Sequence, residues 1–166
     1  IEGMSIGDSL LDFYSKNEIQ NFHTIYYPNS KTFYQIGMII ESNLYDALNI
    51  NLKTDDSKYI IYSIKGLKNV DNKFNQCLEQ KKNMVNQILQ MINNTKEITF
   101  ESKFANNYGK SISYVSEFNL DNGTFHISCS KWDKDNEKII SSGWWDSLNA
   151  SLGSKEWHDW LNKEAY

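Results

Sequence analysis

Arginine is absent from this sequence: all 17 basic residues are lysines, and 21 acidic residues bring the net charge to -4. Arginine is the residue that contacts phosphates through two parallel hydrogen bonds and that reads guanine in nucleic acids. Nucleic-acid binding also depends on clustered positive charge. The chain is therefore a poor candidate for such a protein, and we predict no nucleic-acid partner.

Proline and long apolar runs are also scarce. Proline occurs once, at Pro28, and no apolar run approaches the ~18 residues that a membrane-spanning helix needs. The histidines, His23, His126 and His158, lie far apart in the sequence and match no zinc-ligand spacing. We therefore predict no membrane-spanning segment, no metal and no cofactor.

What the chain does contain is the composition of a folded protein. Hydrophobic residues make up 40% and charged residues 23% of its 166 positions, which is typical of a globular chain. We find no linker, low-complexity tract or block of like charge. The sequence therefore predicts a single globular domain over residues 1–166.

Apolar periodicity predicts an α+β fold. Alternating or fully apolar segments predict strands over residues 32–40, 44–53, 58–67, 97–104, 111–120 and 124–132. A turn over residues 133–136 and a last strand that ends near Leu152 follow. Helical spacing predicts helices over residues 5–15, 72–92 and 155–164. The order α-β-β-β-α-β-β-β-β-α favours an antiparallel sheet of about seven strands with the helices packed on one face. Asn122-Gly123 predicts a type I′ hairpin turn between two of the strands.

The segment Gly7-Asp8-Ser9-Leu10 has the four letters of the GDSL hydrolase signature, in which the serine is the nucleophile. That chemistry requires a base within reach of the serine. In GDSL hydrolases the base belongs to a D-x-x-H motif, and no histidine of this chain has an aspartate three residues before it. We therefore interpret the segment as the start of a helix with Ser5 as N-cap and Asp8 in its first turn. A serine hydrolase that uses Ser9 stays the alternative.

Tryptophans near the C-terminus suggest a binding surface. In the last strand, Trp144 shares a face with apolar residues and is predicted to point inward, so Trp145 points outward. Trp132 and His126 lie on the polar face of the preceding predicted strand. If the two strands pair, His126, Trp132 and Trp145 share a solvent-exposed patch that could contact a protein or small-molecule partner.

The two cysteines are predicted to face the same interior. Cys77 lies on the apolar stripe of the long helix, and Cys129 shares a strand face with Phe125 and Ile127. Two such thiols form a disulfide in an oxidising compartment if their Cα atoms come within about 7 Å. The alternative is two unlinked buried thiols, because the pattern determines the face but not the position along the helix.

The segments GMSIGDSLLDFYS, KYIIYSIKGL and SKEWHDWLNKEAY resemble a family of small exported proteins of unassigned function from marine bacteria with AT-rich genomes. The resemblance implies that a signal peptide is removed just before the segment that starts here, and this would account for the missing initiator Met. It therefore implies a periplasmic or secreted protein. No catalytic residues can be carried over from the family, because none is established for it.

These observations favour an exported binding or interaction domain without catalytic machinery. The alternatives are the Ser9 hydrolase and a cytoplasmic domain with two reduced cysteines.

Overall fold

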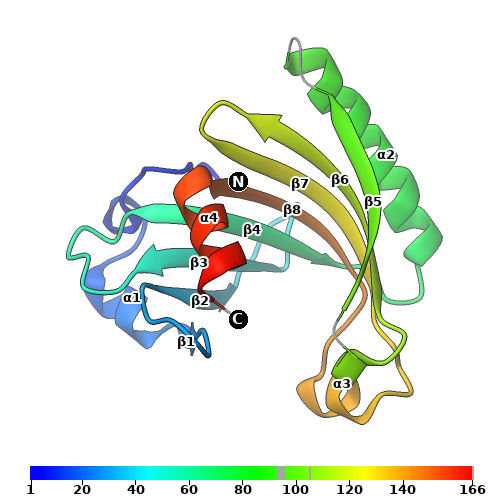
Figure 1. The fold of residues 1–166 in the computed structure, drawn as a ribbon, viewed down its shortest axis with the longest axis horizontal. Helices are drawn as coiled ribbons and strands as arrows, with labels where there is room; N and C mark the ends of the chain where they lie inside the picture. Colours follow the sequence, from blue (N-terminus) through cyan, green and yellow to red (C-terminus); the bar gives the residue numbers. More distant parts are fainter. Residues whose placement is uncertain (93–95, 105, 166) are drawn as a thin grey trace. The chain divides into compact units, whose positions relative to one another are not determined.

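The computed structural model describes residues 1–92, 96–104 and 106–165, and its strands form one antiparallel sheet in the order β1-β2-β3-β4-β8-β7-β6-β5 (Figure 1). The strands are β1 (His23–Tyr26), β2 (Phe33–Ile39), β3 (Ala47–Lys53), β4 (Ile61–Asn69), β5 (Glu97–Lys103), β6 (Ile112–Leu120), β7 (Gly123–Lys131) and β8 (Ser147–Ser154). The helices are α1 (Lys16–Asn21), α2 (Phe74–Met91), α3 (Glu137–Ser142) and α4 (Lys155–Lys163), with 3₁₀ turns η1 (Leu10–Asp12) and η2 (Asn106–Tyr108).

The α+β class and the antiparallel sheet are confirmed, but the sheet has eight strands rather than about seven. The strand that the sequence did not reveal is β1, which is four residues long and mostly exposed. A strand of that length at a sheet edge shows no clear alternation between polar and apolar residues.

The chain divides into two compact units. Unit 1 comprises residues 1–66, 121–124 and 151–166, and unit 2 comprises residues 67–120 and 125–150. Each unit has its own buried apolar residues. The single domain over residues 1–166 stays a prediction.

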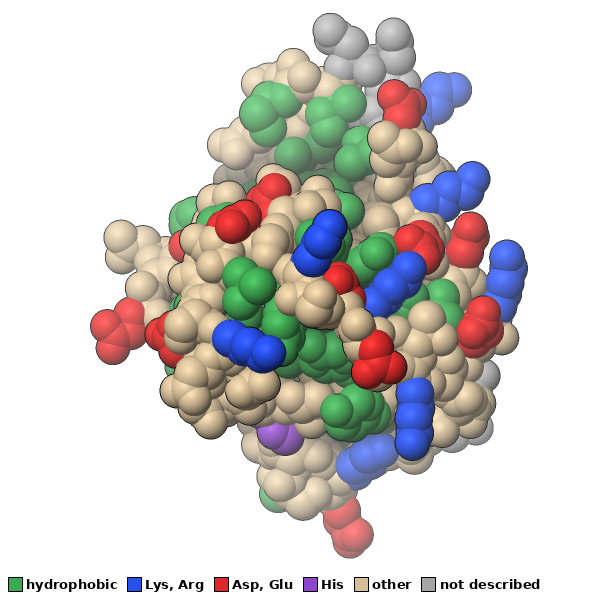
Figure 2. Space-filling view, turned by 90° about the vertical axis from the view of Figure 1, so that its left-hand side faces the viewer, with side chains coloured by type: hydrophobic (Ala, Val, Ile, Leu, Met, Phe, Trp, Pro, Cys, Tyr) green, Lys and Arg blue, Asp and Glu red, His purple; other side chains and the backbone are tan. Residues whose placement is uncertain are grey.

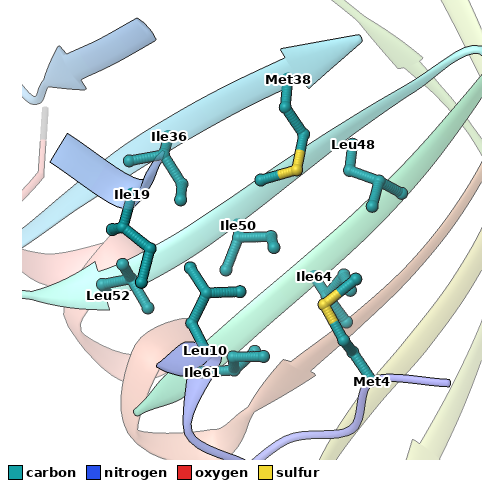
Figure 3. Packing of buried hydrophobic residues seen from close by; sticks show 10 residues of the cluster. All are labelled: Met4, Leu10, Ile19, Ile36, Met38, Leu48, Ile50, Leu52, Ile61 and Ile64. Carbon is teal, nitrogen blue, oxygen red and sulfur yellow. The ribbon is translucent and has the colours of Figure 1, made fainter. Parts of the chain in front are cut away.

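In unit 1, the N-terminal segment and α1 cover one face of β2, β3 and β4 (Figure 3). The core residues of β2 and β3 come from alternate strand positions, and those of β4 and of the N-terminal segment and α1 pack against them. The core residues are Met4, Leu10, Ile19, Ile36, Met38, Leu48, Ile50, Leu52, Ile61 and Ile64. The polar-apolar alternation that predicted β3 is therefore part of the pattern that builds this core.

The opposite face of the same strands is also covered. Phe33 points away from Ile36 on β2 and packs against Trp160 of α4, with ring centroids 4.9 Å apart. Tyr27 contacts the same indole, whose Nε1 donates a hydrogen bond to Ser30 Oγ over 2.9 Å. The prediction that all helices pack on one face is therefore wrong for unit 1, because α1 and α4 cover opposite faces of its strands.

In unit 2, α2 packs on one face of the sheet through a single apolar core. Its members come from α2 and from three strands, together with the residue that follows β4: Val70, Cys77, Val85, Phe118, Ile127, Cys129 and Leu148. Within this core Cys77 and Cys129 form a disulfide, with Cα atoms 6.0 Å apart. The prediction that both thiols face one helix–sheet interface is confirmed.

The other face of the unit 2 strands carries polar side chains, several of them buried. Ser113 and Ser130 lie 3.1 Å apart between their hydroxyl oxygens, and Asn149 Nδ2 donates to Ser130 Oγ over 3.1 Å. All three residues are buried. Buried polar groups need such partners, because leaving one unpaired costs free energy.

Two local predictions at strand ends are wrong. Residues 137–142, assigned to the last strand, form α3 instead, because Asn136 Oδ1 accepts hydrogen bonds from the amides of Lys138 and Ile139 and so caps a helix. The hairpin at Asn122-Gly123 forms, but neither residue has the positive φ of a type I′ turn. A Cβ at Gly123 would collide with the carbonyl oxygen of Gly153, so glycine is required there for close approach.

Candidate binding site

Four aromatic residues meet at one end of unit 2. Phe104 follows β5, Tyr108 precedes β6, Trp132 follows β7 and Trp144 precedes β8. In an antiparallel sheet, the end of one strand lies beside the start of the next. The four positions therefore converge, and we call these residues the loop-end aromatic cluster.

The rings of the loop-end aromatic cluster contact one another in a chain. The ring centroids of Phe104 and Trp132 lie 4.4 Å apart, and those of Trp132 and Trp144 lie 4.6 Å apart. Tyr108 stacks on Trp144 at 5.4 Å with an angle of 24° between the rings. Trp144 nevertheless keeps 38% of its surface exposed, and the other three rings are half-buried.

A cation flanks the cluster. Lys138, on α3, places its Nζ 4.2 Å from the centroid of the Tyr108 ring. An ammonium group over an aromatic face is attracted by the negative charge of the π-system. The cluster therefore combines apolar ring faces with a hydrogen-bond donor at its margin.

Acidic side chains hold the loops that carry these rings. Asp146 Oδ1 accepts the backbone N–H of Trp132 over 2.8 Å, and the backbone N–H of Asp146 donates to Asp71 Oδ1 over 2.7 Å. Lys134 joins the same group, because its Nζ lies 3.0 Å from Asp71 Oδ1 and donates to the carbonyl oxygen of Trp144 over 3.3 Å. Because the backbone atoms of Trp132 and Trp144 both form hydrogen bonds with this network, the network fixes the distance between the two residues.

Asp133 holds the loop before β6. Its carboxylate accepts the backbone N–H of Lys110 over 2.8 Å and that of Asp135 over 3.2 Å, and these hydrogen bonds lower the pKa of the Asp133 carboxyl. Gly109 allows this approach, because it has a φ of +62° and a Cβ there would collide with the Asp133 carboxylate. The carboxylates of Asp71, Asp133 and Asp146 thus bind backbone amides, and those of Asp71 and Asp146 also lie near Lys134.

The predicted patch of His126, Trp132 and Trp145 does not assemble in this form. Trp132 meets Trp144, which is exposed although it was predicted to point inward, and Trp145 is half-buried. His126 lies six residues before Trp132 along β7, a distance of about 20 Å at ~3.3 Å per residue. The side chain of His126 lies 2.9 Å from Glu117 Oε2 on β6.

The predicted faces of Trp144 and Trp145 do not apply, because neither residue belongs to a strand. The prediction assumed that the last strand already included them, but β8 begins at Ser147. The cluster itself had a signal that the sequence analysis did not use. Each of its four aromatic residues lies within four positions of a strand boundary at the same end of the meander.

The hydrogen bonds of the Ser9 side chain are structural ones. Its Oγ donates to the carbonyl oxygen of Lys58 over 2.6 Å and accepts the backbone N–H of Leu11 over 3.2 Å. Ser9, and not Ser5 as predicted, is therefore the N-cap, and it caps the 3₁₀ turn η1 rather than an α-helix. Asp8 does contact Ser5 as expected, because its Oδ2 accepts the backbone N–H of that residue.

No three His, Cys, Asp or Glu side chains among the residues that the structure describes are grouped so that they could hold a metal ion. No helix in residues 1–92, 96–104 and 106–165 combines the length and apolar composition that crossing a bilayer requires. On the face shown in Figure 2, lysines and carboxylates are interspersed, so that face has no large patch of a single charge.

No protein-family model, curated protein or solved structure matches this chain.

Proposed function

We propose that this chain is an exported binding domain without a catalytic task, and that the loop-end aromatic cluster contacts its ligand. The observation that carries the proposal is the chain of three ring contacts among four aromatic residues, which leaves Trp144 exposed on loops held by hydrogen bonds. Loops on a rigid scaffold are where proteins place their binding residues.

The Cys77–Cys129 disulfide supports export. Disulfides form and persist in the periplasm and outside the cell, whereas the cytosol keeps most thiols reduced. Subcellular fractionation of a bacterium that expresses the full-length gene tests this part. Recovery of the chain from the periplasm or medium with both cysteines oxidised is expected, and cytoplasmic recovery with free thiols would overturn it.

The chemistry of the cluster favours a saccharide as the ligand. A sugar ring presents an apolar C–H face that stacks on an aromatic ring, and its hydroxyl groups accept hydrogen bonds from donors such as Lys138 Nζ. Indole and phenol rings supply large contact areas with little loss of conformational freedom. Because the nearby carboxylates hold backbone amides, we assign them no acid–base role.

Tryptophan fluorescence tests the binding surface. Titration with linear hexasaccharides of glucose and of N-acetylglucosamine should give a saturable change for at least one of them. Trp144→Ala should abolish that change, whereas Tyr26→Ala, which removes an aromatic ring that is 61% exposed in unit 1, should preserve it. Absence of binding to both sugars at millimolar concentration, or binding unaffected by Trp144→Ala, would overturn the assignment.

A further inference from the structure

The strand β5 forms one edge of the sheet and is almost fully exposed. Its residues 97–103 pair with β6 in seven consecutive antiparallel positions without a bulge. Ile98 and Phe100 lie on one face of the strand and are 46% and 43% exposed. An edge strand of this kind presents unpaired backbone N–H and C=O groups and is a template for pairing with another chain.

Proteins usually protect such an edge with proline, a bulge, charged side chains or a short strand. β5 contains no proline and no bulge, and its charged residues are Glu97, Glu101 and Lys103. The strand at the other edge, β1, has four residues and is protected by its length. β5 is therefore the longer of the two edges, and it lacks the proline and the bulge that would block pairing.

We propose that β5 pairs with β5 of a second copy of this chain, antiparallel and across a twofold axis at Phe100. The axis sets Phe100 opposite Phe100 of the second copy. It also sets Glu97 opposite Lys103, Ile98 opposite Ser102 and Thr99 opposite Glu101, and these three pairs each occur twice. All seven residues of both strands then take part in the pairing.

Charge complementarity selects this register. The carboxylate of Glu97 faces the ammonium group of Lys103 at both ends of the interface, and opposite charges directly across a strand pair stabilise it. An axis at Thr99 would set Glu97 opposite Glu101, and an axis at Glu101 would set that residue opposite itself. Like charges directly opposite destabilise a pair.

The apolar side chains agree with the same register. Phe100 meets its copy across the axis, and Ile98 lies diagonally next to Phe100 of the second copy on the same face. Diagonal neighbours of this kind are within reach of an aromatic ring. Two half-exposed apolar residues from each chain would therefore form one shared apolar strip.

The chemistry around Glu97 is compatible with such pairing. Ser116 Oγ donates to Glu97 Oε1 over 2.5 Å, and Lys81 Nζ contacts the same Ser116 hydroxyl. Glu97 therefore lies on the side of the strand that faces α2, the same side as Lys103. A seven-residue strand pair buries less surface than standard stable interfaces, and we therefore expect a dimer that dissociates on dilution.

Light scattering coupled to size-exclusion chromatography tests the proposal. At high concentration the mass should approach twice 19.4 kDa and should return to 19.4 kDa on dilution. Phe100→Lys, which sets two ammonium groups against each other at the axis, should give a monomer at every concentration. The matched control Ile25→Lys changes a residue that is 45% exposed on β1 and should leave the dimer unchanged.

Charge reversal tests the register. Lys103→Glu sets a carboxylate opposite Glu97 of the second copy, and it should raise the dissociation constant of the dimer by about tenfold or more. Adding Glu97→Lys to that variant should restore the dimer. Far-ultraviolet circular dichroism confirms that each variant is folded before its mass is compared.

The remaining outcomes contradict the proposal. A wild-type chain that is monomeric at every concentration would show that β5 does not pair. A dimer that survives Phe100→Lys would place the contact elsewhere, and a mass that grows without limit and is reduced by Ile25→Lys would show pairing of β5 with β1. A double variant that stays monomeric while Phe100→Lys is effective would show that the register is wrong.

Discussion

Unit 1 and unit 2 differ in what covers the second face of their strands. In unit 1 both faces are apolar, with aliphatic side chains under α1 and aromatic rings under α4. In unit 2 one face packs on α2, and the other carries hydrogen-bonded serines and an asparagine. The strands of unit 1 and those of unit 2 are therefore stabilised by different interactions.

Burying apolar area is the dominant favourable contribution to folding. Hydrogen bonds between buried polar groups add little net free energy, although removing one partner is costly. Unit 2 has one apolar core instead of two, and it has the disulfide. The comparison indicates that the disulfide of unit 2 and the second apolar core of unit 1 are alternative means of stabilising the strands of each unit. Substitutions can remove each of them separately.

The largest loss is expected from the second core of unit 1. Trp160 is 5% exposed and contacts Phe33 and Tyr27. Trp160→Ala should lower the free energy of unfolding by about 3–5 kcal/mol, because it removes a buried indole and leaves a cavity. Chemical denaturation measures this loss. A loss below about 1 kcal/mol would show that α4 contributes little to unit 1.

A loss of similar size is expected from the cross-link in unit 2. The disulfide joins residues separated by 52 positions, and a loop of that length contributes about 4 kcal/mol in the chain-entropy model. The double variant Cys77→Ala, Cys129→Ala should therefore lower the free energy of unfolding by about 4 kcal/mol. Amide hydrogen exchange should become faster in β6 and β7 but not in β2 and β3.

Mass spectrometry provides the control for the cross-link. The native chain should be about 2 Da lighter than the reduced one. If both cysteines can be alkylated in the unfolded but unreduced protein, the cross-link does not form in solution.

A smaller loss is expected from the polar face of unit 2. Asn149 donates from Nδ2 to Ser130 Oγ, and Asn149→Ala leaves that buried serine with one partner fewer. We expect a loss of about 1–3 kcal/mol. The double-mutant cycle with Ser130→Ala measures the coupling. Additive losses in that cycle would show that the two side chains act independently.

The sequence predicted the parts of this fold that depend on long periodic segments. Alternation in residues 124–132 identified the buried face of β7, and the helical stripe of α2 brought Cys77 to the same core, so the disulfide could be inferred. Both elements are long enough for the burial pattern to show in the residue types.

Short elements could not be predicted in the same way. β1 has four residues and α3 has six, and Ile139-Ile140 in α3 is apolar enough to be interpreted as strand. Adding those residues to the last strand placed Trp144 inside and Trp145 outside. A strand prediction that includes residues outside the strand misassigns their faces, so the prediction that Trp144 points inward is wrong.

Trp144 tests the corrected assignment. Its ring contacts Trp132 and Tyr108 but is 38% exposed. Aromatic contacts contribute about 0.5–1.5 kcal/mol each, so Trp144→Ala should cost about 1–2 kcal/mol. Trp145→Ala, at a half-buried position, should cost more. Thermal unfolding of both variants provides the comparison, and the opposite order would restore the assignment that the sequence predicted.

The smallest effect is expected at the N-terminal 3₁₀ turn. Ser9 is its N-cap and also joins it to Lys58, the residue three positions before β4. Ser9→Ala should therefore cost about 1 kcal/mol, which is typical of a lost N-cap, and should leave saccharide binding unchanged because the loop-end aromatic cluster belongs to unit 2. Ser5→Ala, in which the backbone N–H still donates to Asp8, should cost less. The same pair of variants tests the hydrolase alternative: a serine-directed phosphonate should label neither the wild type nor Ser9→Ala, and labelling that is lost specifically in Ser9→Ala would make Ser9 a nucleophile.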